Sequence, residues 1–250
     1  GPRGALAEFK LVKTEKAAIK PQALSPVDAC ALPSSALTAM LLVEQHVRKG
    51  DRVLVLGASG GVGTHLVQML KPKGVSFVAA TTTQRSLVQG LGADRVLDYR
   101  TEKWWEVPAF KEKPFDLAVD LWGTRDPWDK AVSSGAVKSG RNGGRYITMV
   151  GDSPVIWFQH WWHIFKLIKD MTLREWWTAL FRSYPRWKYH VGLAPSKGNL
   201  ARLLTMAEHG EVKAVIDSTH SFDAEGVKQA FKIQKGRHAH GKVVVVVSEK

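Results

Sequence analysis

Cysteine is nearly absent from this sequence, which contains one, Cys30, in 250 residues. A single cysteine can form neither a disulfide framework nor a cysteine-rich zinc site, and it favours a reducing compartment. No apolar run reaches the roughly 20 residues that span a bilayer, and residues 1–10 lack the apolar core of a signal peptide. The chain opens with Gly-Pro and no methionine, so its first residue need not be the natural start of the protein. We expect a cytoplasmic or mitochondrial protein without a transmembrane segment.

Acidic residues are scarce relative to basic ones. The sequence has 23 Asp and Glu against 36 Lys and Arg, which gives a formal net charge of +13. Such a balance raises nucleic acid as a partner. The basic residues are spread along the chain, however, and no zinc-finger, basic-zipper or RNA-recognition motif is present. We therefore expect a basic surface that attracts anionic ligands and no nucleic-acid partner.

Glycine is concentrated where an apolar run ends. Residues 53–56 form a run of strand length, glycines follow at positions 57, 60, 61 and 63, and residues 65–70 show helical apolar spacing. This order predicts the strand, tight turn and helix of a dinucleotide-binding crossover. The glycines permit the turn, the approach of a pyrophosphate and close packing of the helix, whose N-terminus attracts phosphate.

Strands and helices alternate after this crossover. Further strands are predicted over residues 75–80, 95–99, 115–120 and 144–150, with a helix over 86–91. The pattern predicts an α/β fold with a doubly wound parallel sheet of the Rossmann type. Ligands of such sheets bind at the carboxyl ends of the strands, so the loops that start at Gly57, Thr81, Leu121 and Gly151 should face one crevice.

The two ends of the chain show weaker patterns. Residues 4–12 have strand-like spacing, and two helices are predicted over 27–32 and 34–46, with Ser34 or Ser35 as the N-cap of the second. Near the other end, strands are predicted over 186–193, 212–217 and 242–247, and helices over 196–209 and 224–235. The last strand holds five consecutive valines and should be buried on both faces.

No acid follows the second predicted strand, where an Asp or Glu would bind the 2'-hydroxyl of NAD. Three threonines and Arg85 stand there instead. Because a guanidinium pairs with phosphate and a carboxylate repels it, this pattern predicts NADPH. Two simpler interpretations stay open: the threonines reflect β propensity and helix capping, and Arg85 is a solvated helix residue.

Six of the ten tryptophans fall in residues 154–187, among aliphatic and charged residues with helical spacing. One interpretation is an amphipathic helix pair that packs on the domain or against a second subunit. A hydrophobic lid and an interfacial membrane contact are the alternatives. His160 and His163 lie in this stretch without a nearby carboxylate or cysteine, so we do not assign them to a metal.

Several motifs in order resemble the medium-chain dehydrogenase/reductases, in their zinc-free quinone oxidoreductase branch. They are Ala-Leu-Pro from residue 31 with Leu-Thr-Ala from 37, the glycine stretch 50–63, Leu-Gly-Ala-Asp-Arg-Val-Leu-Asp-Tyr-Arg from 91, Gly-Gly-Arg-Tyr-Ile-Thr-Met-Val-Gly from 143, and His-Gly-Lys-Val-Val-Val from 240. The Trp-rich insertion is similar to that of the mitochondrial reticulon-interacting oxidoreductases of this branch.

The resemblance implies three segments. Residues 1–30 would be the tail of a GroES-like substrate domain, 31–211 the Rossmann domain with the insertion 154–187, and 212–250 the return to the substrate domain. Most of the substrate domain, with the proton donor, would then be missing from this chain. The resemblance also implies no zinc, because Pro33 stands where the zinc enzymes have a cysteine ligand, and a homodimer, which is common in the branch.

A set of cofactor-binding residues is implied by the same resemblance; no catalytic residue can be named. Thr38 would approach the nicotinamide, and the turn after the first strand would hold the pyrophosphate. A second group would surround the adenosine 2'-phosphate, and a third would line the nicotinamide end. In that order the groups are Ser59, Gly60, Gly61, Val62 and Gly63; Thr82, Thr83, Arg85, Tyr99 and Arg237; and Gly151, Asp152, Tyr189, His190 and Val191.

The expected activity is NADPH-dependent hydride transfer to a quinone or an α,β-unsaturated carbonyl, without zinc. A catalytically silent NADPH-binding sensor or scaffold is one alternative. A short-chain dehydrogenase is another, since Tyr184 and Lys188 have the Tyr-x-x-x-Lys spacing of that class. That chemistry needs both residues on one helical turn, whereas Pro185 can begin a helix but not lie within one.

Overall fold

A computed structural model describes residues 6–150, 152, 161–190 and 196–247, with the backbone alone described for residues 161–167. The chain divides into two units, which we describe separately. The first comprises residues 1–44, 59–69 and 193–250, and the second residues 45–58 and 70–192. The domain boundaries predicted at residues 30 and 211 stay a prediction.

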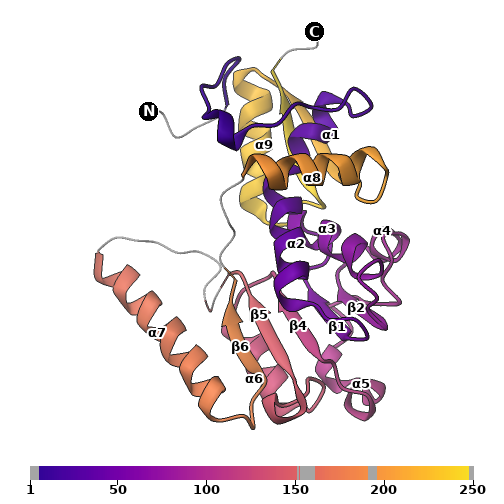
Figure 1. The fold of residues 1–250 in the computed structure, drawn as a ribbon, viewed down its shortest axis with the longest axis vertical. Helices are drawn as coiled ribbons and strands as arrows, with labels where there is room; N and C mark the ends of the chain where they lie inside the picture. Colours follow the sequence, from indigo (N-terminus) through magenta and orange to yellow (C-terminus); the bar gives the residue numbers. More distant parts are fainter. Residues whose placement is uncertain (1–5, 151, 153–160, 191–195, 248–250) are drawn as a thin grey trace. The chain divides into compact units, whose positions relative to one another are not determined.

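In its described part, the second unit contains a sheet of six parallel strands in the order β3-β2-β1-β4-β5-β6 (Figure 1). This arrangement confirms the predicted α/β fold with a doubly wound parallel sheet. The strands are β1 (Arg52–Leu56), β2 (Phe77–Thr81), β3 (Arg95–Leu97), β4 (Leu117–Asp120), β5 (Arg145–Thr148) and β6 (Arg186–Tyr189).

The centre of this sheet is fully covered. All four residues of β4 are buried, as are residues 53–56 of β1, because parallel strands carry helices on both faces. Phe110, Trp128, Tyr146 and Trp187 pack in one buried cluster with residues of the strands. The apolar runs that predicted these strands are therefore the core of the unit.

Helices α4 (Arg85–Gly90), α5 (Pro108–Glu112) and α6 (Arg125–Ser133) lie between successive strands, with short 3-10 turns at Trp104–Glu106 and Gly140–Asn142. The Trp-rich segment forms α7 (Trp161–Leu180), one helix of 20 residues beside β6 (Figure 1). The prediction of a helix pair is wrong for this described stretch, which contains no proline or glycine to break the helix. Residues 153–160 lie outside the described part.

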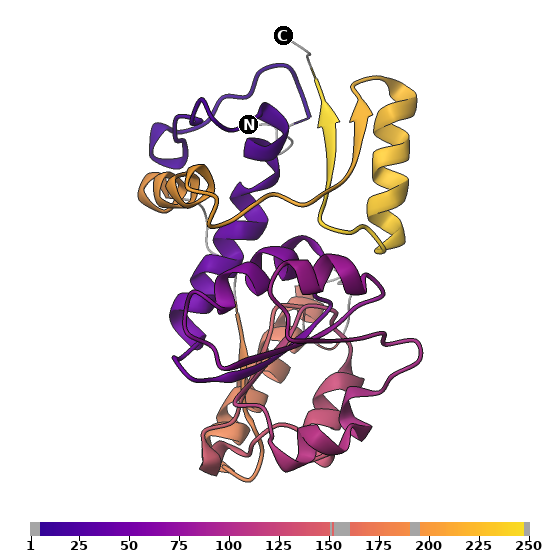
Figure 2. The same cartoon turned by 90° about the vertical axis from the view of Figure 1, so that its right-hand side faces the viewer.

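The first unit is built around a two-stranded parallel sheet of β7 (Ile216–Ser221) and β8 (Lys242–Val246). Helix α9 (Ala224–Gly236) packs against both strands and α1 (Pro26–Ala31) against β8 (Figure 2). The unit also holds the 3-10 turn Thr14–Lys16, α8 (Lys197–Glu208), most of α2 (Pro33–His46) and most of α3 (Gly61–Leu70).

Three sequence predictions are wrong in this unit. Residues 6–12 form no strand, and Phe9 and Leu11 are exposed, because no neighbouring strand in the described part accepts their backbone hydrogen bonds. The strand predicted over 212–217 starts only at Ile216. In β8 only Val244 is buried, since the two-stranded sheet leaves much of this strand without cover.

Helix ends follow local chemistry. The Ser25 hydroxyl accepts a hydrogen bond from the Asp28 N–H at 3.0 Å and caps α1. Helix α2 begins at Pro33 itself, so the prediction that Ser34 or Ser35 caps it is wrong. Proline suits the first position of a helix because the missing N–H would have had no partner in the helix.

Candidate functional site

The carboxyl ends of four strands are level with one another in the second unit. Leu56 of β1 is in register with Thr81 of β2 and with Asp120 of β4, and Asp120 is in register with Thr148 of β5. The loops after Leu56, Thr81 and Asp120 therefore start at one edge of the sheet, as predicted. The predicted loop start at Gly151 lies outside the described residues.

The turn after β1 is held by the neighbouring strand ends. Gly57 has a φ of 80°, in the region that favours glycine, and its N–H donates to Thr81 Oγ1 at 3.3 Å. The Ala58 N–H donates to the Thr81 carbonyl at 3.1 Å, and the Leu121 N–H donates to the Leu56 carbonyl. These bonds fix the first half of the glycine-rich turn.

The second half of the turn, residues 59–63, belongs to the first unit and opens α3. Thr64 N–H is the first to bond within this helix, to the Gly60 carbonyl at 3.0 Å, so the preceding N–H groups have no acceptor in the helix. A helix N-terminus of this kind attracts phosphate. Gly61 is closely packed: a Cβ there would lie 3.1 Å from Ser35 Oγ and 3.2 Å from Lys242 Cδ. Lys242 thus places its side chain beside this helix N-terminus.

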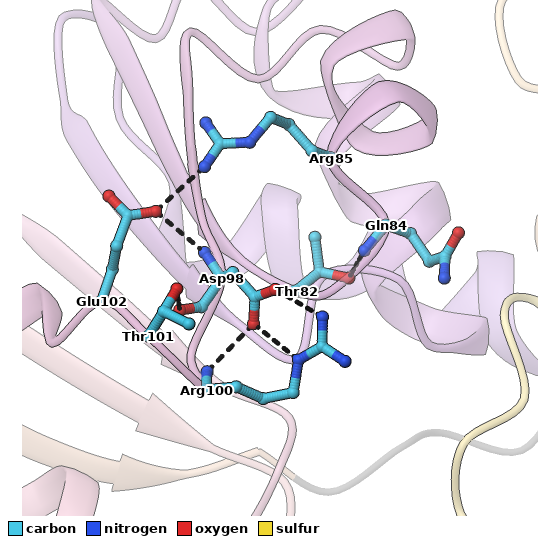
Figure 3. A network of polar contacts seen from close by, with 7 residues as sticks. All are labelled: Thr82, Gln84, Arg85, Asp98, Arg100, Thr101 and Glu102. Carbon is cyan, nitrogen blue, oxygen red and sulfur yellow. Dashed lines mark hydrogen bonds and ion pairs between the residues drawn. The ribbon is translucent and has the colours of Figure 1, made fainter.

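Arginine and acid side chains alternate at the ends of β2 and β3 (Figure 3). Arg85 donates from Nη2 to Glu102 Oε2 at 2.9 Å, and Arg100 donates from Nη2 to Asp98 Oδ2 at 2.6 Å. Hydrogen bonds from Arg100 lower the pKa of Asp98 from its ordinary 3.8 to about 2. We call these four residues the ribose-edge network. Thr82 Oγ1 is buried beside it and accepts from the Gln84 N–H at 3.0 Å.

The ribose-edge network changes the argument for NADPH. The sequence places no acid directly after β2, but the fold brings Glu102 to Arg85 and keeps Asp98 next to Arg100. Both arginines therefore have carboxylate partners in this structure. A 2'-phosphate would have to compete with Glu102 for Arg85. Sequence reasoning missed Asp98, Arg100 and Glu102, although two of them flank Tyr99.

A buried carboxylate organises the loop after β4. Asp120 Oδ1 accepts from the N–H groups of Trp122 at 3.0 Å and Gly123 at 3.1 Å, and its Oδ2 accepts from the Tyr146 hydroxyl at 3.0 Å. Burial raises the pKa of Asp120 above its ordinary value. Burial also raises the pKa of the Tyr146 hydroxyl, well above its ordinary value. Sequence reasoning missed this role, for which the only signal is a polar residue that ends an apolar run.

Two of the predicted site residues, Thr38 and Asp152, have other partners in this structure, and a third, Arg237, ends a helix. The Thr38 hydroxyl donates to the Ser34 carbonyl at 2.8 Å within α2, in the first unit. Asp152, in the second unit, accepts from Arg174 and lies 3.6 Å from Arg125, and these arginines lower its pKa. Arg237 is exposed and ends α9 in the left-handed conformation.

Three further predicted residues lie in the second unit. Thr83 is half-buried. Tyr99 is exposed, and its ring centroid lies 6.1 Å from that of Trp122. Tyr189 ends β6 and is half-buried, which raises its pKa. The predicted residues Gly151 and Val191 lie outside the described part.

His190 follows β6 and forms a buried pair. Its Nδ1 lies 3.2 Å from His46 Nε2, and burial lowers the pKa of both rings. The two histidines are therefore neutral at physiological pH, and one ring donates to the other. No pattern in the sequence links residues 144 positions apart.

The short-chain dehydrogenase alternative is wrong. Lys188 lies in strand β6, whereas Tyr184 precedes that strand, so the two side chains do not share a helical turn. Among the described residues, no group of three or more His, Cys, Asp or Glu could hold a metal ion. In the same part of the chain, no helix is long and apolar enough to cross a membrane.

A parallel sheet in this strand order, with a glycine-rich turn between β1 and α3, is that of a dinucleotide-binding fold. The sequence model of the family described as "Zinc-binding dehydrogenase" matches residues 91–245. The chain belongs to this family, within the medium-chain dehydrogenase/reductases, which confirms the resemblance drawn from the sequence.

Individual relatives agree. The chain is 31% identical over 263 residues to the mitochondrial NAD(P)H oxidoreductase RTN4IP1 of Bos taurus, covering 98% of this chain and 62% of the relative. It is 31% identical over 252 residues to the chloroplastic NADPH-dependent alkenal/one oxidoreductase of Arabidopsis thaliana, covering 98% and 54%. A crystal structure of an NAD-dependent alcohol dehydrogenase matches with a TM-score of 0.72 at 26% identity, over 98% of this chain and 66% of that one. The chain thus spans less than two thirds of these curated relatives.

Proposed function

We propose that this protein is an NADPH-dependent reductase that transfers a hydride to a quinone or an α,β-unsaturated carbonyl without using zinc. The observation that carries the proposal is the glycine-rich turn at the level carboxyl ends of the strands, in a chain of this family. The printed activities of two relatives, NAD(P)H oxidoreductase and alkenal/one oxidoreductase, support the reaction class. We also propose a homodimer in the mitochondrion or cytoplasm.

Residues in each unit fit the cofactor. In the first unit, the N-terminus of α3 presents backbone N–H groups, and Lys242 adds a positive charge beside them. These groups suit a pyrophosphate. Ser59, Gly60, Val62 and Gly63 complete this part of the proposal.

In the second unit, Arg85 and Arg100 of the ribose-edge network suit a 2'-phosphate. Thr82, Thr83 and Tyr99 complete this group, and Tyr189 and His190 are proposed to line the nicotinamide end. Bound NADPH supplies the hydride, while the chain binds, orients and shields it. Asp120 holds the loop 121–123 in one conformation at the same sheet edge.

Cofactor preference tests the proposal through two opposite substitutions. Arg85→Ala removes a hydrogen-bond donor to the 2'-phosphate. NADPH should therefore bind about tenfold or more weakly, while the affinity for NADH should change little. Glu102→Gln frees Arg85 of its competing carboxylate, so NADPH should bind more tightly and NADH should again change little. Arg202→Ala, which removes another exposed arginine paired with an acid, Glu44, is the matched control. Dissociation constants from calorimetric titration would measure all three; equal loss for both cofactors in Arg85→Ala would contradict the assignment.

Turnover tests the reaction. The full chain with NADPH should reduce a simple quinone or enone, followed by the absorbance of NADPH. Tight NADPH binding without turnover on a panel of quinones and enones would instead support the sensor or scaffold. Treatment with a zinc chelator should leave the rate unchanged, and a loss of activity restored by added zinc would contradict the zinc-free assignment.

A further inference from the structure

The outward face of α7 is an apolar stripe of Leu173, Trp176, Trp177 and Leu180. Their spacing of i, i+3, i+4 and i+7 places them on one side of the helix. Their exposed fractions are 57%, 78%, 55% and 75%, so the described residues of the second unit leave this face uncovered. Large apolar side chains at adjacent positions with this much exposure mark a binding surface rather than scattered surface residues.

The opposite face of α7 attaches the helix to the second unit. Met171 packs against the buried cluster, the Arg174 guanidinium lies 5.1 Å from the centre of the Trp187 ring, and Thr178 Oγ1 accepts from the Trp187 N–H at 3.1 Å. Positions 171, 174 and 178 share one side of the helix. The apolar stripe is therefore not the packing face of a helix that has come loose.

A cationic pocket adjoins one flank of α7. It is a cavity of about 530 Å³ whose charged lining consists of Arg48, Arg145, Arg182, Arg186 and Lys188, with Thr178 and Ala179 of α7 also in its wall. The lining contains no Asp or Glu. Arg145 pairs with Asp51 at 2.6 Å, so its charge is compensated. The other four cations of the lining give the pocket an excess of positive charge.

The other flank of α7 forms an apolar groove with α6. This cavity of about 540 Å³ is lined by Trp128, Val132, Leu173, Trp177 and Tyr184, with Arg125, Asp129, Arg174 and Thr178 as its polar members. An apolar stripe thus lies between a pocket for negative charge and a groove for hydrocarbon. A phospholipid has both of these parts.

We propose that α7 binds an anionic phospholipid bilayer from its surface, with the helix in the interfacial plane. Tryptophan is suited to this depth because its ring is apolar while its N–H can stay hydrated. The cationic pocket would receive lipid phosphate, and each Lys or Arg near an anionic surface adds attraction. The segment from Lys166 to Lys188 contains six Lys and Arg and two acids, Asp170 and Glu175. Its net charge is therefore positive, as attraction to an anionic surface requires.

A second copy of the chain fits this face less well. In a two-fold dimer whose axis crosses α7, the cations of the two pockets would approach each other, and neither pocket lining holds an acid. A bilayer that contains anionic lipid instead neutralises them.

Vesicle binding by the full chain tests the proposal. The protein should sediment with vesicles of phosphatidylcholine and phosphatidylglycerol at low salt, and bind far less to phosphatidylcholine alone or at high salt. Arg182→Gln with Arg186→Gln should lower partitioning about 25-fold, at about fivefold per charge. Trp176→Gln with Leu180→Gln should lower it at least about tenfold.

Helix α9 of the first unit provides matched controls. Lys228→Gln with Lys232→Gln removes two exposed charges, and Phe231→Gln removes one exposed aromatic ring. These variants should bind vesicles within about twofold of the parent, a change too small to count as a lost contact. Unchanged circular dichroism of every variant excludes misfolding as the cause.

Five results would overturn the proposal. The first three are no binding of the parent to anionic vesicles, parental binding by the Trp176 and Leu180 variant, and losses in the α9 controls that equal those in α7. The fourth is a change of oligomeric state in the stripe variant by analytical ultracentrifugation, which would assign the face to a second copy. If inorganic phosphate displaces the protein from vesicles while the stripe variant binds normally, the pocket serves a small anion and the proposal is wrong.

Discussion

Replacing Asp120 should separate its role as a hydrogen-bond acceptor from its cost as a buried charge. In Asp120→Ala, the Tyr146 hydroxyl and the Gly123 N–H, both buried, lose their acceptor, and so does the N–H of Trp122, which is an exposed residue. Each buried unpaired group costs about 1–3 kcal/mol. Removal of the carboxylate also removes the cost of burying its charge, which offsets part of this loss. We therefore expect the free energy of unfolding to fall by about 3 kcal/mol.

Asparagine supplies the contrast. Asp120→Asn keeps an acceptor for the two N–H groups, and its amide can donate to the Tyr146 oxygen. We expect its stability at neutral pH to lie within about 1 kcal/mol of the parent. In thermal unfolding, Asp120→Ala should melt about 6–12 °C below the parent, and Asp120→Asn close to it.

The pH dependence gives a second measurement. Because burial raises the folded-state pKa of Asp120, the folded parent takes up a proton before the unfolded chain does as the pH falls. The stability of the parent relative to Asp120→Asn should rise as the pH drops through that raised pKa, and level off below the ordinary value of 3.8. Urea unfolding at several acidic pH values would measure it. Equal stability of the alanine and asparagine variants, or a flat difference across this range, would refute the reasoning.

Three further predictions use other contacts. Burial, with nearby positive charge, lowers the pKa of His46 from 6.5 to about 4, so the unfolded chain takes up this proton first and acidification over that interval should cost stability, at most about 3 kcal/mol because solvent screens part of the effect. His46→Gln should remove most of that loss in urea unfolding. Arg145→Met leaves the buried Asp51 carboxylate without its cation and should cost about 3 kcal/mol or more, whereas each of the two exposed pairs lost in Arg125→Met, with Asp129 and Asp152, should cost less than about 1 kcal/mol by the same assay. Lys242→Gln should weaken NADPH binding about fivefold in calorimetric titration, and an unchanged affinity would remove this residue from the phosphate site.

The sheet could be predicted because burial leaves a direct record in the sequence. Strands β1 and β4 are covered on both faces, and their sequences are continuous apolar runs. Gly57 follows β1 because the chain has a positive φ at this position. In β8 the same reasoning failed. Five valines record a preference for extended backbone, but cover depends on neighbouring elements, and one neighbouring strand in the described part leaves most of them half-buried.

The candidate site could be predicted in residue types but not in pairings. Arg85 was expected from the missing acid after β2, yet its partner Glu102 lies 17 residues later and comes to it only through β3. Likewise, Asp120 and Tyr146 are 26 residues apart, and they meet because β4 and β5 are adjacent in the sheet. Such contacts depend on which strands are neighbours in the sheet. The sequence shows only the order of the apolar runs along the chain.

Helix α7 also affects which chains can pair with this sheet. In β6, the N–H groups of Arg186 and His190 point to β5, so that of Trp187 points outward, where Thr178 Oγ1 of α7 accepts it. An edge strand normally offers such groups to any extended chain. A strand arriving at β6 would have to displace a threonine to bond there. The hydrogen exchange of this one amide should therefore report whether the edge of the sheet is occupied by the protein's own helix or open to another strand.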